Sequence, residues 1–174
     1  IQFSDIEINN VLNNLVSSST FNVYLRLFAS NVDGINLDNI IEAYPISGSW
    51  GMGTGREGDI IQNTNGVSWE YRTASGSNSW VTSSFSTYVT ASFHPSYSGG
   101  GTWYTGSSLG LNVIHSQSFS YNEDTDIKLD VTTTIRTWYS GGLPNNGFIL
   151  KQRKSDEFNN NTNYSTTFEY FSVD

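Results

Sequence analysis

Residues 127–151, IKLDVTTTIRTWYSGGLPNNGFILK, constrain the fold of this chain more than any other stretch. Apolar and polar residues alternate over 127–131, which predicts a strand. Asp130 or Thr132 can then accept hydrogen bonds from the free backbone N–H groups at the start of a short helix. The helix would carry one apolar stripe at positions i, i+4 and i+7, formed by Val131, Ile135 and Trp138.

The same segment predicts where the helix ends and how the chain turns back. Gly141-Gly142 supplies a left-handed stop, and Pro144 prevents the helix from resuming. Asn145-Asn146-Gly147 predicts a tight turn into a second strand over 148–150. The sequence therefore predicts a β-rich chain with one short helix between two strands, and this helix would close one end of a β-sandwich.

The composition supports an all-β fold. Aromatic residues make up 14% of the chain and charged residues another 14%, while Ser, Thr, Asn and Gly together form nearly half of it. Aromatic residues and Thr favour strands, and Gly and Asn favour turns. Hydroxyl and amide side chains would therefore keep the surface of this protein hydrated, as Lys and Glu side chains do in most cytosolic enzymes. Such a surface is typical of many extracellular and virion β-proteins.

Strand periodicity recurs along most of the chain. The predicted strands cover 21–29, 40–46, 67–72, the end of 80–93, 109–121, 127–131, 148–150 and 168–172. Two Gly-rich stretches, 47–66 and 96–101, are expected to be surface loops, and the first of them holds Trp50. About eight strands with one short helix near 131–140 predict a jelly-roll-like antiparallel β-sandwich.

The 174 residues suit one sandwich domain, 21–174, with a short N-terminal arm over 1–20. The arm has an apolar pattern that allows a short helix around 9–16, although several Asn residues weaken it. Two interpretations stay open. The arm docks on a neighbouring subunit, or it is an ordinary first strand or loop.

Charge and cysteine content exclude several functions. The chain has 8 basic and 16 acidic residues, a net charge of −8, and no basic face that could neutralise phosphates, so we expect no nucleic-acid partner. No apolar run approaches the roughly 20 residues needed to span a bilayer, so no membrane insertion is expected. The absence of Cys excludes disulfides, thiol catalysis and Cys-based zinc sites.

Several short motifs occur over residues 20–174: Tyr24-Leu25-Arg26-Leu27, Ile41-Glu42-Ala43-Tyr44, Ser49-Trp50, Gly53-Thr54-Gly55, the sequence NGVSWEYR over 65–72, and the segment over 130–151. Together these motifs resemble the DNRLRE family of β-sandwich domains. The Asn-rich N-terminus departs from the opening strands of that family. The family resembles polysaccharide-binding modules and recurs in wall-attached and phage proteins. The sequences at Tyr44-Pro45-Ile46, 65–69 and 143–148 are similar to sequences in virion structural proteins of tailed marine phages.

The resemblance implies a non-enzymatic structural domain of a phage virion, in a tail, a fibre or the capsid surface. It would act in assembly and host attachment at the extracellular surface of the virion. Its partners would be copies of itself or other virion proteins, together with a host-surface polysaccharide. The alternative is a carbohydrate-binding module, and a polysaccharide-degrading enzyme ranks third. Such an enzyme would need two carboxylates in one groove, but the Glu residues are spread singly along the chain.

Aromatic residues are the best candidates for binding a glycan, because sugar rings stack their C–H faces on indole and phenol rings. Those expected in or beside loops are Trp50, Trp80, Tyr97, Trp103 and Tyr104. Trp69 and Trp138 follow the strand and helix periodicities instead, so both are assigned to the core. For any single loop aromatic, structural packing is the competing explanation.

Metal and cofactor signals are weak. Asp124 and Asp126 lie in an acidic stretch that favours a solvated turn, with a structural calcium ion as the alternative. His94 and His115 fall in different elements and show no spacing typical of a metal site or a catalytic triad. We therefore expect no catalytic residue and no other cofactor.

Overall fold

The computed structural model describes residues 1–15, 21–33, 39–55, 60, 64–74, 78–80, 89–94, 97–105, 112–120, 126–153 and 167–171. Within them the elements follow as α1 (Asp5–Leu15), β1 (Tyr24–Leu27), β2 (Ala29–Asp33), β3 (Asn39–Pro45), β4 (Val89–His94), β5 (Tyr97–Tyr104), β6 (His115–Phe119), β7 (Ile127–Asp130), α2 (Thr132–Tyr139), β8 (Phe148–Gln152) and β9 (Thr167–Tyr170). The strands pair antiparallel, which confirms the predicted all-β antiparallel fold.

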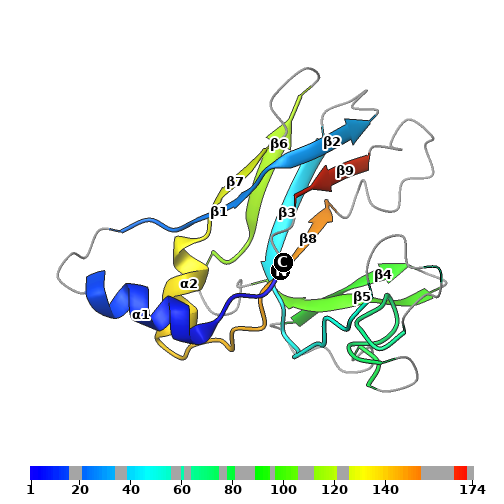
Figure 1. The fold of residues 1–174 in the computed structure, drawn as a ribbon, viewed down its shortest axis with the longest axis horizontal. Helices are drawn as coiled ribbons and strands as arrows, with labels where there is room; N and C mark the ends of the chain where they lie inside the picture. Colours follow the sequence, from blue (N-terminus) through cyan, green and yellow to red (C-terminus); the bar gives the residue numbers. More distant parts are fainter. Residues whose placement is uncertain are drawn as a thin grey trace.

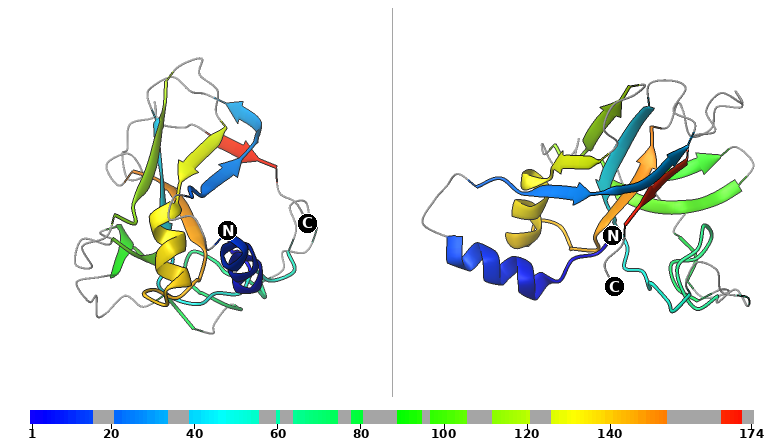
Figure 2. Two further views of the ribbon diagram at one scale, coloured as in Figure 1. Left: turned by 90° about the vertical axis from the view of Figure 1, so that its left-hand side faces the viewer. Right: turned by 45° about the horizontal axis from the view of Figure 1, so that its top comes forward.

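The strands form a sandwich with the helices at one end (Figures 1 and 2). One layer is the sheet β6-β3-β8, and the other contains the pairs β1-β7 and β2-β9. The β4-β5 hairpin lies beside the sandwich and is joined to the chain after β3 by a bridge between Ile46 and Trp103. Among the described helices, none has the length and apolar character needed to cross a membrane.

Both layers and both helices contribute to one hydrophobic core. Its buried residues are Leu12, Leu25, Ile41, Ala43, Val113, Phe119, Ile127, Leu129, Val131, Ile135, Trp138, Leu143 and Phe148. In β3 and β7 buried positions alternate with more exposed ones, as expected for strands that cover a core on one face. The core therefore extends from between the two strand layers to α2.

Helix α2 closes one end of the sandwich with the predicted apolar stripe. Val131, Ile135 and Trp138 are all buried, which confirms their assignment to the core. The N-cap residue of α2 is Val131, and its side chain makes no capping hydrogen bond, so the predicted cap position is off by one residue. The carboxylate of Asp130 does accept a hydrogen bond from a free backbone N–H at the helix start, that of Thr132, at 3.0 Å.

The C-terminus of α2 ends at the predicted glycines. Gly141 has a φ of 74°, and its N–H donates to the carbonyl of Trp138 at 3.0 Å. The Gly142 N–H donates to the carbonyl of Thr137 at 2.9 Å. This pair of bonds defines a Schellman motif, which satisfies carbonyl groups that the helix leaves free. The left-handed stop is confirmed.

The predicted turn over 145–147 holds the first residues of the chain against β8. The Gly147 N–H donates to Asn145 Oδ1 at 3.2 Å. Ile1 and Phe148 exchange two backbone hydrogen bonds, of 2.7 and 2.9 Å. Gly147 permits this approach, because its φ is 81° and a Cβ there would collide with the backbone of Ile1 and Gln2. A glycine is therefore required at this position.

The arm contains a helix, as one of the predicted patterns allowed, and it begins earlier than expected, at Asp5. Leu12 is buried in the core, and Ile8 packs against the core from the same face. The hydroxyl of Tyr139 in α2 donates to Asn13 Oδ1 at 2.9 Å. Helix α1 therefore packs on α2 of its own chain.

Two of the predicted strands are interrupted or shorter than expected. The strand over 21–29 breaks between β1 and β2, because the N–H of Ala29 donates to the carboxylate of Asp126 at 2.8 Å. Of the strand predicted over 109–121, the structure describes 112–120, and within that range β6 is the strand; 109–111 and 121 fall outside the described residues. The predicted strand at the C-terminus is present as β9.

Two of the predictions around the Gly-rich stretches are wrong. Residues 67–72 form turns rather than a strand, because the Ser68 N–H donates to the Tyr71 carbonyl at 2.8 Å and the Tyr71 N–H donates to Ser68 Oγ at 3.0 Å. The expected loop at 96–101 lies largely in β5, whose backbone pairs with β4. Gly101 has a φ of 91°, and a Cβ there would lie 3.1 Å from the side chain of Ile149. The absence of a Cβ therefore lets the backbone of β5 pack closely against Ile149.

His115 is a buried core residue of β6. Its Nε2 lies 2.8 Å from the hydroxyl of Thr134, and its ring meets Phe148 edge-on at 6.1 Å. Burial lowers the pKa of His115 below its usual 6.5, and the nearby Asp130 offsets part of this effect. The imidazole is therefore held neutral in the folded protein.

Stability should consequently fall on mild acidification. The His115 pKa is lowered in the folded state, so below 6.5 the unfolded chain binds more protons and the free energy of unfolding decreases. Urea denaturation between about pH 7.5 and 5.5 measures this slope. In the His115→Gln variant the slope should flatten. A wild-type protein whose stability stays constant or rises toward pH 5.5 would contradict the burial of a neutral histidine.

Candidate functional site

The chain between β3 and β4 folds back on itself in its described part. The Gly51 N–H donates to the Arg72 carbonyl at 2.9 Å, and the Val67 N–H donates to the Gly51 carbonyl at 2.7 Å. The Trp80 N–H donates to the Glu70 carbonyl at 3.1 Å. These bonds connect turns that are distant in sequence, so this loop has a defined shape without forming a named strand.

Glycines in this loop let two backbone segments touch. Gly53 has a φ of 77°, and a Cβ on it would lie 2.6 Å from the Cα of Gly66. Next to this contact, the Thr54 N–H donates to Asn65 Oδ1 at 2.9 Å. Gly53 and Gly66 are thus explained by backbone packing that only glycine allows.

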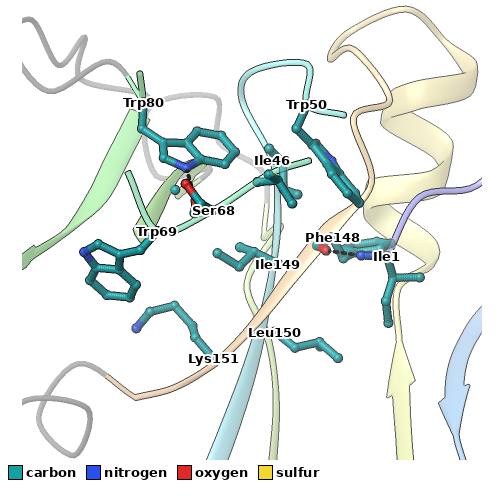
Figure 3. Close-up of a pocket in the computed structure, with 12 residues that line it drawn as sticks. Ile1, Ile46, Trp50, Ser68, Trp69, Trp80, Phe148, Ile149, Leu150 and Lys151 are labelled. Carbon is teal, nitrogen blue, oxygen red and sulfur yellow. Dashed lines mark hydrogen bonds between the residues drawn. The ribbon is translucent and has the colours of Figure 1, made fainter. Parts of the chain in front are cut away.

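This loop, β5 and β8 line an open pocket of about 430 Å³ (Figure 3). Its lining residues are Ile1, Ile46, Trp50, Val67, Ser68, Trp69, Trp80, Gly101, Phe148, Ile149, Leu150 and Lys151. Most of these are apolar, and three are tryptophans. Among the described lining residues, Lys151 has the charged side chain and none is Asp or Glu. A largely apolar pocket with a few polar groups is the usual form of a small-molecule site.

Two of the three tryptophans are fixed by hydrogen bonds. Trp50 Nε1 donates to the carbonyl of Asn146 at 2.8 Å, and Trp80 Nε1 donates to the carbonyl of Ser68 at 3.1 Å. Trp80 is 5% exposed, and Trp50 is half-buried. Figure 3 shows the Trp80 and Trp50 rings on opposite sides of Ile46. Their polar edges are bonded to the protein, so both rings have set orientations.

Trp69 is the exposed aromatic ring of the pocket, and its assignment to the core is wrong. It is 50% exposed and lies near Lys151 and Trp80 in Figure 3. The alternation of Val67, Trp69 and Tyr71 suggested a strand that buries one face, but local turns replace the strand there. The Asn65-Gly66 pair just before this stretch is a turn signal that could have indicated the exposure of Trp69.

The other aromatic residues predicted to bind a glycan, Trp103, Tyr104 and Tyr97, are not among the described lining residues of this pocket. Trp103 is 4% exposed, packs against Tyr44 at 5.5 Å between ring centroids, and has the Lys151 ammonium 5.3 Å from its own ring. Tyr104 is half-buried and packs against the core, and burial raises its pKa. Tyr97 pairs with His94 in the hairpin, and its side chain falls outside the described residues. Of the predicted set, the pocket therefore contains Trp50 and Trp80.

Of the two predicted calcium ligands, Asp124 and Asp126, the structure describes Asp126. Asp126 Oδ1 accepts the N–H of Ala29 at 2.8 Å. Burial, with a smaller contribution from the Asp126 charge, raises the pKa of Tyr170 to about 12. Asp124 lies outside the described residues. Within the described residues no group of three His, Asp or Glu side chains is arranged to hold a metal ion. The calcium site at Asp124 and Asp126 stays a prediction.

Compared with models of protein families, with curated proteins and with solved structures, the chain matches none. The resemblance to the DNRLRE family and to phage virion proteins therefore stays a prediction. The candidate site is defined by its geometry alone: an open apolar pocket with one half-exposed indole, Trp69, and two indoles in set orientations, Trp50 and Trp80.

Proposed function

We propose that this domain is a non-enzymatic carbohydrate-binding module and that a saccharide ring occupies the pocket formed by Trp50, Trp69 and Trp80. The observation that carries the proposal is the half-exposed ring of Trp69 at an apolar pocket of about 430 Å³. A sugar presents an apolar C–H face and a polar edge, so it suits a wall of aromatic rings with a few polar groups.

The polar groups beside the tryptophans suit sugar hydroxyls. Ser68 and Lys151 line the same pocket as Trp69. The fixed orientations of Trp50 and Trp80 favour the proposal, because rings held before binding lose little conformational freedom on binding. A hydrolase gains no support from this pocket, since its described lining residues include no carboxylate.

A glycan array probed with the purified protein tests this proposal. We expect binding to a defined subset of polysaccharides, followed by saturable titration with an oligosaccharide of that subset. Since the proposed contacts come from one open pocket, an affinity for a single oligosaccharide in the range of about 1 mM to 1 µM is expected. Binding to no glycan on a broad array would contradict the proposal.

A second candidate function, assembly as a structural component of a virion, is favoured by helix α1. Ile6 is 72% exposed, and Val11 and Leu15 on the same helix are exposed as well. Exposed apolar side chains on one element favour contact with another subunit. This proposal also has support from the sequence resemblance to phage virion proteins. Its partners would be copies of this chain or other virion proteins, at the outer surface of a virion that contacts host polysaccharide.

Light scattering of the full chain over a range of concentrations tests assembly. Removing the arm is a poor test, because Leu12 belongs to the core and Ile1 pairs with Phe148. Its loss would expose the core, so point substitutions on the outer face of α1 are preferable. A chain that stays monomeric at all concentrations would contradict self-assembly.

A further inference from the structure

Strand β8 is an outer strand of the sheet β6-β3-β8, so one of its two edges faces no neighbouring strand of that sheet (Figure 1). At one end of its pairing with β3, the Ile46 N–H donates to the Gly147 carbonyl at 2.9 Å. At the other end, the Arg153 N–H donates to the Ile40 carbonyl at 3.2 Å. Backbone groups alternate in direction along a strand, so every second residue from 147 to 153 is bonded to β3. The backbone groups of 148, 150 and 152 therefore point to the open edge.

The chain itself already fills the first hydrogen-bonding position of this edge. Phe148 exchanges two backbone hydrogen bonds with Ile1, which confirms the direction of its N–H and carbonyl groups. At the far end, the carbonyl of Gln152 accepts the Lys151 ammonium at 2.8 Å, and lysines commonly shield open strands in this way. Between them, the N–H and carbonyl of Leu150 face the edge with no backbone partner in the described part of the chain. Leu150 therefore presents a donor and an acceptor next to a position that extended backbone already occupies.

An open, mostly apolar pocket lies on each face of β8 along this edge. We call the one between the strand layers the inner pocket; it has about 390 Å³ and is lined by Ile41, Ile127, Leu150, Lys151, Gln152, Phe168 and Tyr170. Leu150 packs against the core from this side, and Phe168 and Tyr170 belong to β9 of the other layer. On the opposite face, Ile149 and Lys151 line the pocket of the three tryptophans. A strand added at the edge would therefore direct alternate side chains toward two different pockets.

A second copy of β8 does not fit as the added strand. Two β8 strands related by a two-fold axis would pair through the same residues. With the axis at Lys151, two ammonium groups would lie on directly opposite residues, and like charges in that position destabilise a sheet. With the axis at Leu150, a second Gln152 would need the place opposite Phe148 that Ile1 occupies. The open edge therefore suits a segment of different sequence.

We infer that β8 binds an extended segment of another polypeptide by strand addition, antiparallel to β8 and ending beside Ile1. Two main-chain hydrogen bonds at Leu150 would hold the segment, with a further one from the N–H of Gln152. The residue opposite Leu150 would place an apolar side chain in the inner pocket, against the two aromatic rings of β9. In this binding mode, main-chain bonds supply affinity and pockets for alternate side chains supply specificity. Strand addition does not depend on sugar binding, because none of these contacts involves the three tryptophans.

Selection from a displayed library of random linear peptides on the full chain tests strand addition. We expect the selected peptides to carry apolar residues at alternate positions and, once synthesised, to bind with dissociation constants of about 1–100 µM in fluorescence anisotropy. Leu150→Pro removes the edge N–H and leaves the pairing with β3 intact, a position where strands tolerate proline. It should weaken peptide binding at least about 10-fold. Leu150→Ile keeps both the N–H and an apolar side chain, so this matched control should bind as the wild type does.

Circular dichroism shows whether Leu150→Pro is folded. If it is not, N-methyl groups placed in turn along the peptide replace it, since each removes one peptide N–H. Sensitivity to these groups should then alternate from one position to the next, because every second N–H of an added strand points away from β8. A library that yields no binding peptide, equal binding to folded Leu150→Pro, or uniform sensitivity to N-methylation would overturn the inference. Self-association that Leu150→Pro abolishes, without peptide binding, would make a second copy the occupant and would overturn it as well.

Discussion

Replacing Phe148 by alanine should lower the free energy of unfolding by about 3–5 kcal/mol, the largest effect expected from a single substitution here. Phe148 is 1% exposed and packs against Trp138, with 4.8 Å between the ring centroids. Its ring also meets Phe3 at 6.3 Å and His115 at 6.1 Å. The substitution therefore leaves a cavity where α2, β6 and β8 meet the N-terminal residues.

Urea denaturation measures this effect, with Phe171→Ala as the matched control. Phe171 is 66% exposed, so its removal should change the free energy of unfolding by less than about 0.5 kcal/mol. Equal effects of the two substitutions would contradict the position of Phe148 at the centre of the core. The loss at Phe148 also alters one wall of the pocket, so this variant does not test sugar binding by itself.

Replacing Trp69 by alanine should weaken saccharide binding by about 10-fold or more while leaving the fold intact. Its ring is the most exposed of the three indoles that line the pocket, and its loss removes an aromatic contact surface. Because the side chain is half-exposed, stability should fall by about 1 kcal/mol or less. Calorimetric titration with an oligosaccharide from the array gives the affinity, and thermal unfolding gives the stability.

Trp69→Phe is the conservative counterpart of this substitution, because it keeps an aromatic face. It should retain more affinity than the alanine variant. Phe171→Ala, on another exposed aromatic residue, should bind the saccharide as the wild type does. Wild-type affinity in Trp69→Ala would show that the ligand binds elsewhere, even if the protein binds a glycan.

The sequence predicts the α2 segment well because its signals are local. The apolar stripe of Val131, Ile135 and Trp138 sits next to Gly141 and Pro144, and the stop at Gly141 needs no distant partner. The antiparallel sandwich is likewise predicted from alternation in strands such as β3 and β7. Asp130 accepts the predicted backbone hydrogen bond at the helix start, but the N-cap residue itself is Val131. Sequence patterns locate the ends of a helix only to within one or two residues.

The candidate site is harder to predict because distant residues assemble it. Trp50 is expected in a loop, but its hydrogen-bond partner Asn146 lies 96 residues away. The exposure of Trp69 depends on turn hydrogen bonds that override a strand-like alternation. Trp103 follows a Gly-rich stretch that suggests a loop, yet pairing with β4 buries it in a hairpin. Turn chemistry and tertiary contacts thus decide which aromatic residue a ligand can reach.

Indole N–H chemical shifts show directly whether a saccharide binds in the pocket formed by Trp50, Trp69 and Trp80. The chain has five tryptophans, so a nitrogen–proton correlation spectrum reports on each of them. On titration with a saccharide that the array identifies, we expect the largest shift at Trp69, with further changes at Trp50 and Trp80 and smaller ones at Trp103 and Trp138. A spectrum in which Trp69 does not move, or in which the largest change falls on Trp103 or Trp138, would contradict the assignment of this pocket as the sugar-binding site.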